Sequence, residues 1–308
     1  MGKLVQTNQK MKVNIQNSWG DQIFSITSGL VLAIICLLTL LPVVTVMLNS
    51  LTPTKDLVNN PNSFIVIPSY ITFNHYIWLF KGSQRIFTAY TITILRTLVG
   101  TFLCLFMTVV TAYPLSKKYL PGRNGIMKLF FFTLIFSGGM IPTFLVVNGM
   151  KITDTFFALL IPCALNVYYM IIMRTFFASI PEEISEAARI DGASDVTVLF
   201  KIILPLALPS MAAIGLFYAV FHWNSFMDVV MYINKRSLWP LQMLLREILV
   251  TNDIGELSLG GLIQDAARPP ASVITNCTLV VSALPLMCIY PFLQKYFVKG
   301  LMIGSVKG

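Results

Sequence analysis

Six long apolar runs divide this chain, and each is long enough to cross a lipid bilayer. An α-helix rises 1.5 Å per residue, so about 20 apolar residues span the hydrocarbon core. Hydrophobic residues make up 56% of the 308 positions and charged residues only 11%. Such a chain cannot hide its apolar surface from water, so we expect an all-α membrane protein with six transmembrane helices. The predicted spans are 23–48, 86–113, 126–147, 155–177, 206–233 and 272–297.

The segments between these runs hold most of the polar and turn-forming residues. Residues 49–84 are rich in Asn, Ser, Pro and aromatic residues, which predicts an external loop with anchors at the membrane interface. Residues 234–271 form a second external segment, and its amphipathic stretch 241–249 predicts an interfacial helix. The sequence S-G-G-M-I-P at 137–142 predicts a local break in the third span.

Lysine and arginine are unevenly distributed over the two sides of this six-span arrangement. The net charge is +9, but the basic residues are scattered between apolar runs, which argues against a nucleic-acid-binding face. One side of the arrangement carries more lysine and arginine residues than the other, and they lie in shorter connections. We therefore expect that side to be the cytoplasmic side of a bacterial plasma membrane. Residues 1–22 and 293–308 then form cytoplasmic terminal segments. The larger set is Lys3, Lys10, Lys12, Lys117, Lys118, Arg123, Lys128, Arg174, Arg189, Lys201, Lys295, Lys299 and Lys307.

Residues 179–210 are the most polar stretch inside the apolar chain, and their pattern predicts two short helices joined by a tight turn. Ser179 and Glu182 have the spacing of a capping box at the start of the first helix. Gly192 can adopt the positive φ that ends a helix. Ser194 is placed to cap the second helix, which Pro205 should end or bend. A compact helical pair of this kind suits docking to another protein.

The same stretch resembles the EAA loop of binding-protein-dependent ABC importer permeases. That loop has the form E-A-A-x3-G-x9-I-x-L-P, and all its fixed positions match here. The resemblance implies a type I permease fold in which this loop is a cytoplasmic coupling helix docked in a cleft of the ATP-binding subunit. Glu186 would then face basic groups on that subunit, Ala187 and Ala188 would permit close approach, and Gly192 would allow the turn. The matching residues are Glu186, Ala187, Ala188, Gly192, Ile202, Leu204 and Pro205.

Further segments resemble the carbohydrate, maltose-type group of these permeases. The stretches F-S-G-G-M-I-P-T at 136–143 and A-L-x-x-P-x-A-L-N-V at 158–167 look like those of oligosaccharide permeases, including permeases for acidic polysaccharide fragments. The resemblance implies a shared transmembrane domain over 84–292, preceded by an extension over 23–83. It also implies an assembly with a second, non-identical permease, two ATPase subunits and an external solute-binding protein. ATP and Mg would be bound by the ATPase subunits, and this chain would need no cofactor.

The last residues also resemble a family feature. The pattern G-L-x-x-G-x-V-K-G from Gly300 to Gly308 is similar to the maltose-type ending that reaches into the ATPase dimer interface. The alternative is a frayed basic tail. For Asp191, as for Glu186, the alternative to a coupling role is a solvated acid on a cytoplasmic helix. The predicted coupling residues are Glu186, Ala187, Ala188, Asp191, Gly192, Leu204, Pro205, Gly300 and Lys307.

Arg96 is the one charged residue deep inside a predicted span. A charge in the membrane is costly, so Arg96 should either bind an acidic or hydroxyl-rich solute or pin this chain to a partner helix. Aromatic and polar residues in later spans could line a sugar pathway, although anchoring at the membrane interface explains Trp and Tyr equally well. The candidate pathway residues are Arg96, Gly138, Gly139, Met140, Asn166, Tyr168, His222, Trp223, Asn224 and Asp228.

Catalysis and metal binding find little support in the sequence. There is no phosphate-binding G-x4-G-K-[ST] loop, no cluster of nucleophile and base, and only two histidines. The five cysteines lie in apolar runs without a C-x-x-C pair, as small core residues do. Two alternatives remain: the same machine with a non-sugar solute, and an ion-coupled secondary transporter. The second would want paired intramembrane acids and inverted repeats, and neither is visible. The sequence does not specify which sugar is carried.

Overall fold

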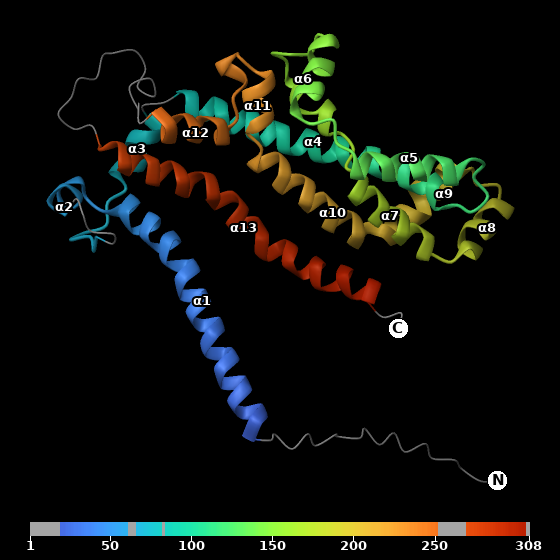
Figure 1. Cartoon of the computed structure of the whole chain (residues 1–308), viewed down its shortest axis with the longest axis horizontal. Coiled ribbons are helices and arrows are strands. Elements are labelled where there is room, and N and C mark those ends of the chain that lie inside the picture. The colour runs from blue at the N-terminus through green and yellow to red at the C-terminus, as the bar shows by residue number, and fades with distance from the viewer. Residues whose placement is uncertain (1–18, 61–65, 82–83, 252–268, 306–308) are drawn as a thin grey trace.

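A computed structural model of the chain describes residues 19–60, 66–81, 84–251 and 269–305, with side chains at most of these positions up to residue 289 (Figure 1). The described residues form helices and connecting segments and contain no strand. The short helices are α2 (Thr54–Asn59), α3 (Asn74–Lys81), α8 (Glu182–Ile190), α9 (Asp195–Val198), α11 (Met227–Tyr232) and α12 (Leu241–Thr251). The longer ones are α1 (Trp19–Leu51), α4 (Gln84–Ser116), α5 (Arg123–Ile135), α6 (Met140–Gly149), α7 (Val167–Ser179), α10 (Leu204–Asn224) and α13 (Ala271–Ser305).

The predicted membrane spans are found as helices or as broken helices. Four helical stretches are long and apolar enough to cross a membrane, and the total reaches six when two bent pairs each count as one span. The helices α1, α4 and α13 contain the predicted spans 23–48, 86–113 and 272–297, and all three extend beyond them. The helix α13 continues to Ser305, so the predicted tail at 293–308 begins inside this helix. The all-helical, multi-pass fold is thereby confirmed.

The bounds predicted for the fifth span, 206–233, are wrong at both ends. One continuous helical stretch runs from Asp195 to Asn224 and includes the π turn η3 (Leu199–Ile203). Pro205 was expected to end or bend the second coupling helix, yet the helix continues past it. A proline cannot donate the backbone bond of a regular helix, and the π turn just before Pro205 changes the bonding pattern there. At its other end the helix stops at Asn224, and a separate helix, α11, begins at Met227.

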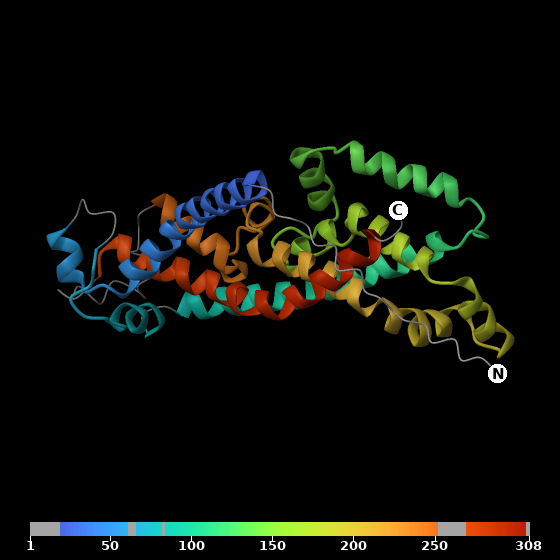
Figure 2. The same ribbon diagram turned by 90° about the horizontal axis from the view of Figure 1, so that it is seen from below.

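The third and fourth spans are broken more sharply than the sequence predicts. The helices α5 and α6 meet at an angle of 117°, and Gly139 between them has φ of 83°. The predicted break at 137–142 is thus confirmed, but it is a reversal of direction rather than a local kink. The fourth span begins as two 3₁₀ turns, η1 (Phe156–Leu159) and η2 (Ile161–Cys163), which meet α7 at 53°. Figure 2 shows α5 and α6 standing off from the other helices.

The helix α4 is the centre of the fold, and it packs most extensively against α10 and α7 (Figure 1). At this contact the Thr108 hydroxyl lies 2.8 Å from the Tyr218 hydroxyl, so a polar pair is satisfied inside an apolar core. Nearby, the ring of His222 lies directly against Gly100. A side chain at position 100 would meet that ring, so glycine at this position sets how closely α4 and α10 approach.

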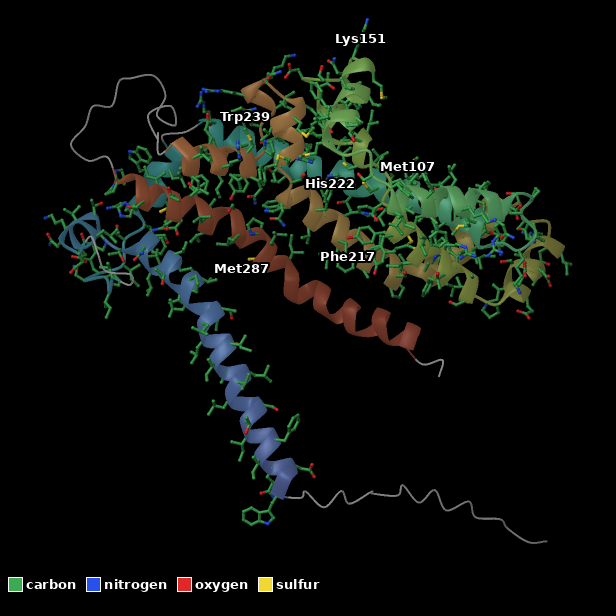
Figure 3. All side chains as sticks on the ribbon, viewed as in Figure 1. Met107, Lys151, Phe217, His222, Trp239 and Met287 are labelled. Carbon is green, nitrogen blue, oxygen red and sulfur yellow. The ribbon has the colours of Figure 1, made fainter. Side chains whose placement is uncertain are left out.

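The helix α12 is confirmed where the sequence predicts an interfacial helix, but its apolar face is covered by protein. Leu244 and Ile248 are buried in a cluster with Leu79 of α3, Ile86 of α4 and Ile274 of α13. In contrast, only 6% of the apolar core of α1 is buried inside this chain, and α1 contacts mainly α13. The side chains of α1 therefore project away from the rest of the chain along most of its length (Figure 3).

We predict that Gly100→Ala lowers the thermal stability of the purified protein. An added Cβ would lie 2.5 Å from His222 Nε2, and overpacking of this kind costs about 1–3 kcal/mol. Gly29→Ala in α1 is the matched control, because no atom lies within 4 Å of its added Cβ. Thermal unfolding in detergent measures both variants. An unchanged melting temperature for Gly100→Ala would show that α4 and α10 separate at little cost.

Candidate functional site

The residues of the EAA motif form a helical pair at one end of the molecule. The helices α8 and α9 lie at the end of the molecule that is far from α3 and α12 (Figure 1). Gly192 joins them with φ of 83°, as the sequence predicts. The hydroxyl of Ser194 accepts a hydrogen bond from the Thr197 N–H at 3.3 Å, so the predicted N-cap of α9 is also confirmed.

The predicted capping box of α8 is wrong. Ser179 is the last residue of α7, and its hydroxyl donates to the Phe176 carbonyl at 2.7 Å. Pro181 precedes α8 and provides no side-chain cap. The backbone extends at Ile180 between the two helices, so Ser179 cannot reach the first turn of α8. The acidic side chains of Glu182 and Glu183 lie in that first turn, where they complement the helix dipole.

The motif residues divide between an outward and an inward face. Glu186, Ala187, Asp191 and Gly192 are exposed, whereas Ala188 is buried in the core formed by α4, α7 and α10. The small side chain of Ala188 therefore lets α8 pack against its own chain, and its predicted role in the approach of a partner stays a prediction. Of the other predicted coupling residues, Pro205 is exposed, Leu204 is half-buried, Gly300 lies in α13 and Lys307 lies outside the described residues.

Large apolar side chains are exposed on the same helical pair. Ile190 of α8 is 87% exposed, and Val196 of α9 is 65% exposed. Ile184 and Phe200 are exposed as well, and Glu186 and Asp191 lie among them in the sequence. Exposed apolar residues rimmed by polar ones are typical of a protein interaction site. We call Ile184, Glu186, Ala187, Ile190, Asp191 and Val196 the coupling surface.

An arginine holds α8 and α9 together and fastens them to the connection after α4. Arg189 donates to Asp195 Oδ1 from Nε at 3.1 Å and from Nη2 at 2.7 Å. It also donates to the hydroxyl of Tyr119, and its guanidinium lies 5.1 Å from the centre of the Tyr119 ring. The hydrogen bonds to Asp195 and then to Tyr119 raise the pKa of Arg189 above its ordinary value. Sequence reasoning missed this clamp, because Tyr119 is 70 residues away from Arg189.

A second contact joins α8 to the same connection. Lys117 donates to the Ser185 hydroxyl at 3.2 Å, and its ammonium group lies 5.4 Å from the centre of the Tyr113 ring. Burial lowers the pKa of Lys117, and nearby Glu182 opposes that shift. The carbonyl of Leu115 accepts hydrogen bonds at 2.9 Å from both Arg123 and Arg174, as cations at a helix C-terminus do. The Lys117 hydrogen bond therefore connects the end of α4 to the helix α8, which carries part of the coupling surface.

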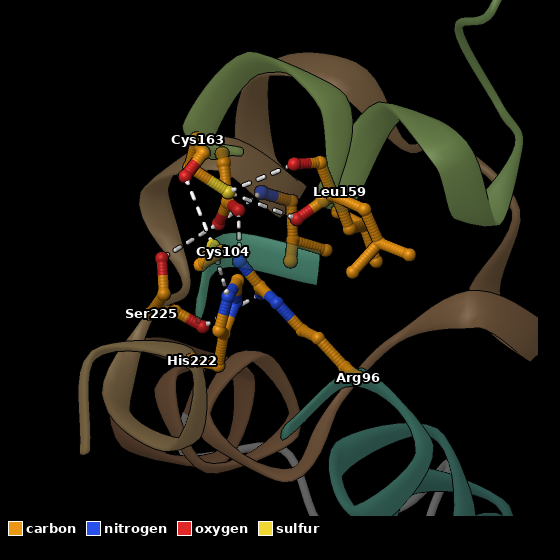
Figure 4. Close-up of polar contacts among 9 residues, drawn as sticks. Arg96, Cys104, Leu159, Cys163, His222 and Ser225 are labelled. Atoms are coloured by element: carbon orange, nitrogen blue, oxygen red, sulfur yellow. Dashed lines mark hydrogen bonds and ion pairs between the residues drawn. The ribbon is translucent and has the colours of Figure 1, made fainter. Parts of the chain in front are cut away.

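The second group of predicted site residues surrounds the break between α10 and α11 (Figure 4). Arg96 of α4 is fully buried and forms an ion pair with Asp228 of α11. Its Nη1 donates to the Ser225 carbonyl at 3.2 Å, inside the break itself. Asp228 also accepts from the Ser225 hydroxyl and the Val229 N–H, both at 3.0 Å. Arg96 therefore joins α4 to α11 within this chain, and its predicted role toward a solute or a partner helix stays a prediction.

Buried thiol and imidazole groups lie beside this ion pair. The thiol of Cys104 donates to the Cys163 carbonyl at 3.2 Å and lies 3.4 Å from His222 Nε2. Cys104 and Cys277 are buried as predicted for core cysteines, whereas Cys36 and Cys288 are exposed on α1 and α13. The cluster in Figure 4 therefore joins α4, η2 and α10 around the ends of two broken spans.

The other candidate pathway residues have separate positions and partners. Asn166 caps α7 by accepting from the N–H groups of Tyr168 and Tyr169 at 3.0 and 3.3 Å. Trp223 is buried, and its indole N–H donates to the Ser282 carbonyl of α13 at 3.1 Å. These two residues have structural partners that the sequence did not indicate. The exposed members are Gly138, Gly139, Met140, Asn166, Tyr168 and Asn224.

We predict that Arg189→Ala loosens the coupling helices without unfolding the protein. The arginine joins α8, α9 and the connection after α4, so its loss should raise amide exchange in residues 182–199. An exposed ion pair of ordinary strength predicts an increase of about two- to fivefold. Hydrogen–deuterium exchange with mass spectrometry measures it. Lys118→Ala removes an exposed cation from the same connection and should leave the exchange unchanged; equal effects of both variants would contradict the clamp.

We predict a strong coupling between Arg96→Gln and Asp228→Asn. Each single substitution leaves a buried or partly buried charge unpaired and should cost about 3–5 kcal/mol of stability. The double variant should cost clearly less than the sum, because it removes both charges together. Thermal unfolding of the wild type, the two single variants and the double variant gives the double-mutant cycle. Additive losses would mean that the two side chains do not depend on each other.

Comparison with known proteins agrees with this geometry. The model of the family described as "Binding-protein-dependent transport system inner membrane component" matches residues 119–302. The polygalacturonan/rhamnogalacturonan transport system permease protein YtcP of Bacillus subtilis (strain 168) is 39% identical over 284 residues, which are 91% of this chain and 95% of that protein. Protein LplC of the same organism is 38% identical and covers 96% of this chain and 98% of its own length.

A solved structure has the same fold. It is the crystal structure of a bacterial ABC transporter involved in the import of the acidic polysaccharide alginate, and one of its chains matches with a TM-score of 0.83. The two chains are 33% identical, and the match covers 91% of this chain and 98% of the other. The matched family model and these relatives, together with the helical fold, identify a multi-pass membrane transport component rather than an enzyme. The chain belongs to the family of binding-protein-dependent transport system inner membrane components.

Proposed function

We propose that the chain is the permease subunit of an ATP-driven importer and forms half of the translocation pathway for an oligosaccharide. The observation that carries this proposal is the coupling surface, an exposed apolar and acidic helix pair at one end of the bundle. Two ATPase subunits would bind ATP and Mg, and one of them would dock on this surface. The coupling surface and both termini are then cytoplasmic. The second half of the pathway comes from a second permease, and cargo arrives on a solute-binding protein.

An acidic oligosaccharide is the cargo that the relatives favour. YtcP is named for polygalacturonan and rhamnogalacturonan, and the alginate importer is described as taking up an acidic polysaccharide. Both cover more than nine-tenths of this chain at more than 30% identity. Polymers of uronic acids carry one carboxylate per acidic sugar unit. A permease for such cargo would benefit from cations near the entrance of its pathway.

The contacts of α4 suggest how docking would act on the pathway. The ATPase would move α8 and α9, and the Arg189 and Lys117 contacts would transmit that movement to the end of α4. The same helix carries Arg96, which holds the break between α10 and α11. A movement of α4 would therefore reposition the broken spans. A partner biases such a conformational equilibrium only through its different affinity for the two states.

We predict that Gly192→Pro and Glu186→Lys leave the complex assembled but uncouple it. Proline fixes φ near −65°, so it cannot adopt the φ of 83° found at position 192. Lysine reverses the charge at an exposed position of the coupling surface. A coupling free energy of about 1–3 kcal/mol predicts a loss of cargo-stimulated ATP hydrolysis of about five- to 100-fold.

The measurement uses the complete transporter reconstituted in liposomes, with ATP hydrolysis recorded with and without loaded binding protein. Lys118→Glu is the control, because it reverses an exposed charge in the neighbouring connection without touching the coupling surface. Undiminished cargo stimulation in both Gly192→Pro and Glu186→Lys would remove the coupling role from α8 and α9.

A further inference from the structure

A cavity of about 240 Å³ lies beside the coupling surface, at the end of α4. Three parts of the chain form its wall: the last turn of α4, the connection that follows α4, and the helix α9 with the π turn η3. Val196 belongs both to this wall and to the coupling surface, and it is 65% exposed. A partner docked on the coupling surface therefore lies at the rim of the cavity. The polar lining residues are Tyr113, Lys117, Tyr119 and Asp195.

The hydroxyl of Tyr113 is a buried polar group without a partner. Tyr113 is only 7% exposed, and its hydroxyl makes no hydrogen bond to any residue that the structure describes. The ring packs edge-on against Phe177, with 5.9 Å between the ring centres. A buried hydroxyl without a hydrogen bond is costly, and such groups are rare in folded proteins. The cavity that Tyr113 lines can accommodate the missing partner.

The ammonium group of Lys117 is a second hydrogen-bond donor at the same cavity. It has three N–H donors, and one of them is used on the Ser185 hydroxyl at 3.2 Å. It also lies 5.4 Å from the centre of the Tyr113 ring, so the two residues are neighbours. Asp195, the carboxylate of the lining, accepts from Arg189 instead. A further carboxylate can accept from both donors, because its two oxygens offer about four lone-pair sites.

We propose that this cavity receives a carboxylate side chain, glutamate or aspartate, of the ATPase subunit. The inference rests on the proposed function, which places an ATPase subunit on the coupling surface. The carboxylate accepts from the Tyr113 hydroxyl and the Lys117 ammonium, and the apolar part of the lining packs against its CH₂ groups. Hydrogen bonds of this charged kind are about twice as strong as neutral ones. The site links the ATPase subunit directly to α4, in addition to the route through α8 and α9.

A small metabolite and an anionic lipid headgroup are the competing occupants. Pockets for small molecules measure about 300–1,000 Å³, so a cavity of about 240 Å³ suits one side chain better. Anionic headgroups bind to clusters of several basic residues, whereas one lysine lines this cavity. The cavity also adjoins Val196 on the coupling surface, where the ATPase subunit would dock. These three observations favour a carboxylate of that subunit.

The variant Tyr113→Phe removes only the hydroxyl and separates docking from folding. Because this hydroxyl has no partner among the described residues, the variant permease should melt at the wild-type temperature or slightly above it. Its affinity for the ATPase subunit should nevertheless fall by about tenfold, since docking loses a hydrogen bond to a carboxylate. Biolayer interferometry with the purified ATPase subunit and the permease pair in nanodiscs measures this affinity. The matched control is Tyr70→Phe, at an exposed tyrosine just before α3, which should bind as the wild type does.

Carbodiimide coupling tests the chemistry of the occupant. The reagent joins an amine to a carboxylate in direct contact by forming an amide, and it takes up the released water as a urea. In the complete transporter it should join Lys117 to a glutamate or aspartate of the ATPase subunit, which mass spectrometry of the linked peptides identifies. Lys117→Arg keeps the positive charge but has no primary amine, so this cross-link should disappear in that variant.

Several results would overturn the proposal. One is wild-type ATPase affinity in Tyr113→Phe, and another is a lower melting temperature of that variant, which would show that the hydroxyl is already bonded within the permease. Carbodiimide links from Lys117 only to Glu182, Glu186 or Asp195 of its own chain would also exclude an ATPase carboxylate. A loss of affinity in phosphatidylglycerol nanodiscs but not in phosphatidylcholine nanodiscs would assign the cavity to an anionic lipid headgroup.

The wild-type transporter separates this inference from the proposed function. If it binds the ATPase subunit and shows cargo-stimulated ATP hydrolysis while Tyr113→Phe binds equally well, the cavity proposal fails and the proposed function stands. If the wild-type permease pair does not bind the ATPase subunit at all, the proposed function itself fails.

Discussion

The break between α10 and α11 depends on Arg96. A helix that stops inside the bundle leaves backbone carbonyl groups without their helical partners, and such groups are costly away from water. Arg96 donates to the carbonyl of Ser225 in the break, and its charge is balanced by Asp228. Asp228 in turn accepts from the Val229 N–H at the start of α11. One buried cation therefore satisfies the end of one helix and, through its anion, the beginning of the next.

Because Arg96 belongs to α4, the break is tied to the rest of the bundle. The ring of His222 packs on Gly100 one turn further along, so α4 and α10 approach closely next to Arg96. At its other end α4 is held by Lys117 to α8, and the following connection is held by Tyr119 to Arg189. A single helix thus connects the exposed coupling surface with the interior of the bundle, which is how a polar loop at one end can influence irregular backbone about 30 Å away.

The long regular helices, the Gly192 turn and the Ser194 cap were predictable from the sequence, whereas the capping box of α8 was wrong and the long-range contacts were not predictable. Apolar runs indicated α1, α4 and α13, and the EAA spacing indicated α8, the left-handed Gly192 and the Ser194 cap. The 117° reversal at α5 and α6 and the π turn before Pro205 depend on packing between spans, which periodicity does not encode. Arg96 was identified as exceptional, but its partner lies 132 residues away, and no sequence pattern pairs residues at that separation.

The pairing of Arg96 also bears on how acidic cargo would be handled. The Arg96 guanidinium is fully buried, paired with Asp228 and bound to the Ser225 carbonyl. Its hydrogen bonds therefore already stabilise the fold. Releasing it to a passing carboxylate would leave Asp228 and the Ser225 carbonyl unsatisfied, at a cost of several kcal/mol. Cargo recognition by charge is therefore better served by cations that remain open to solvent.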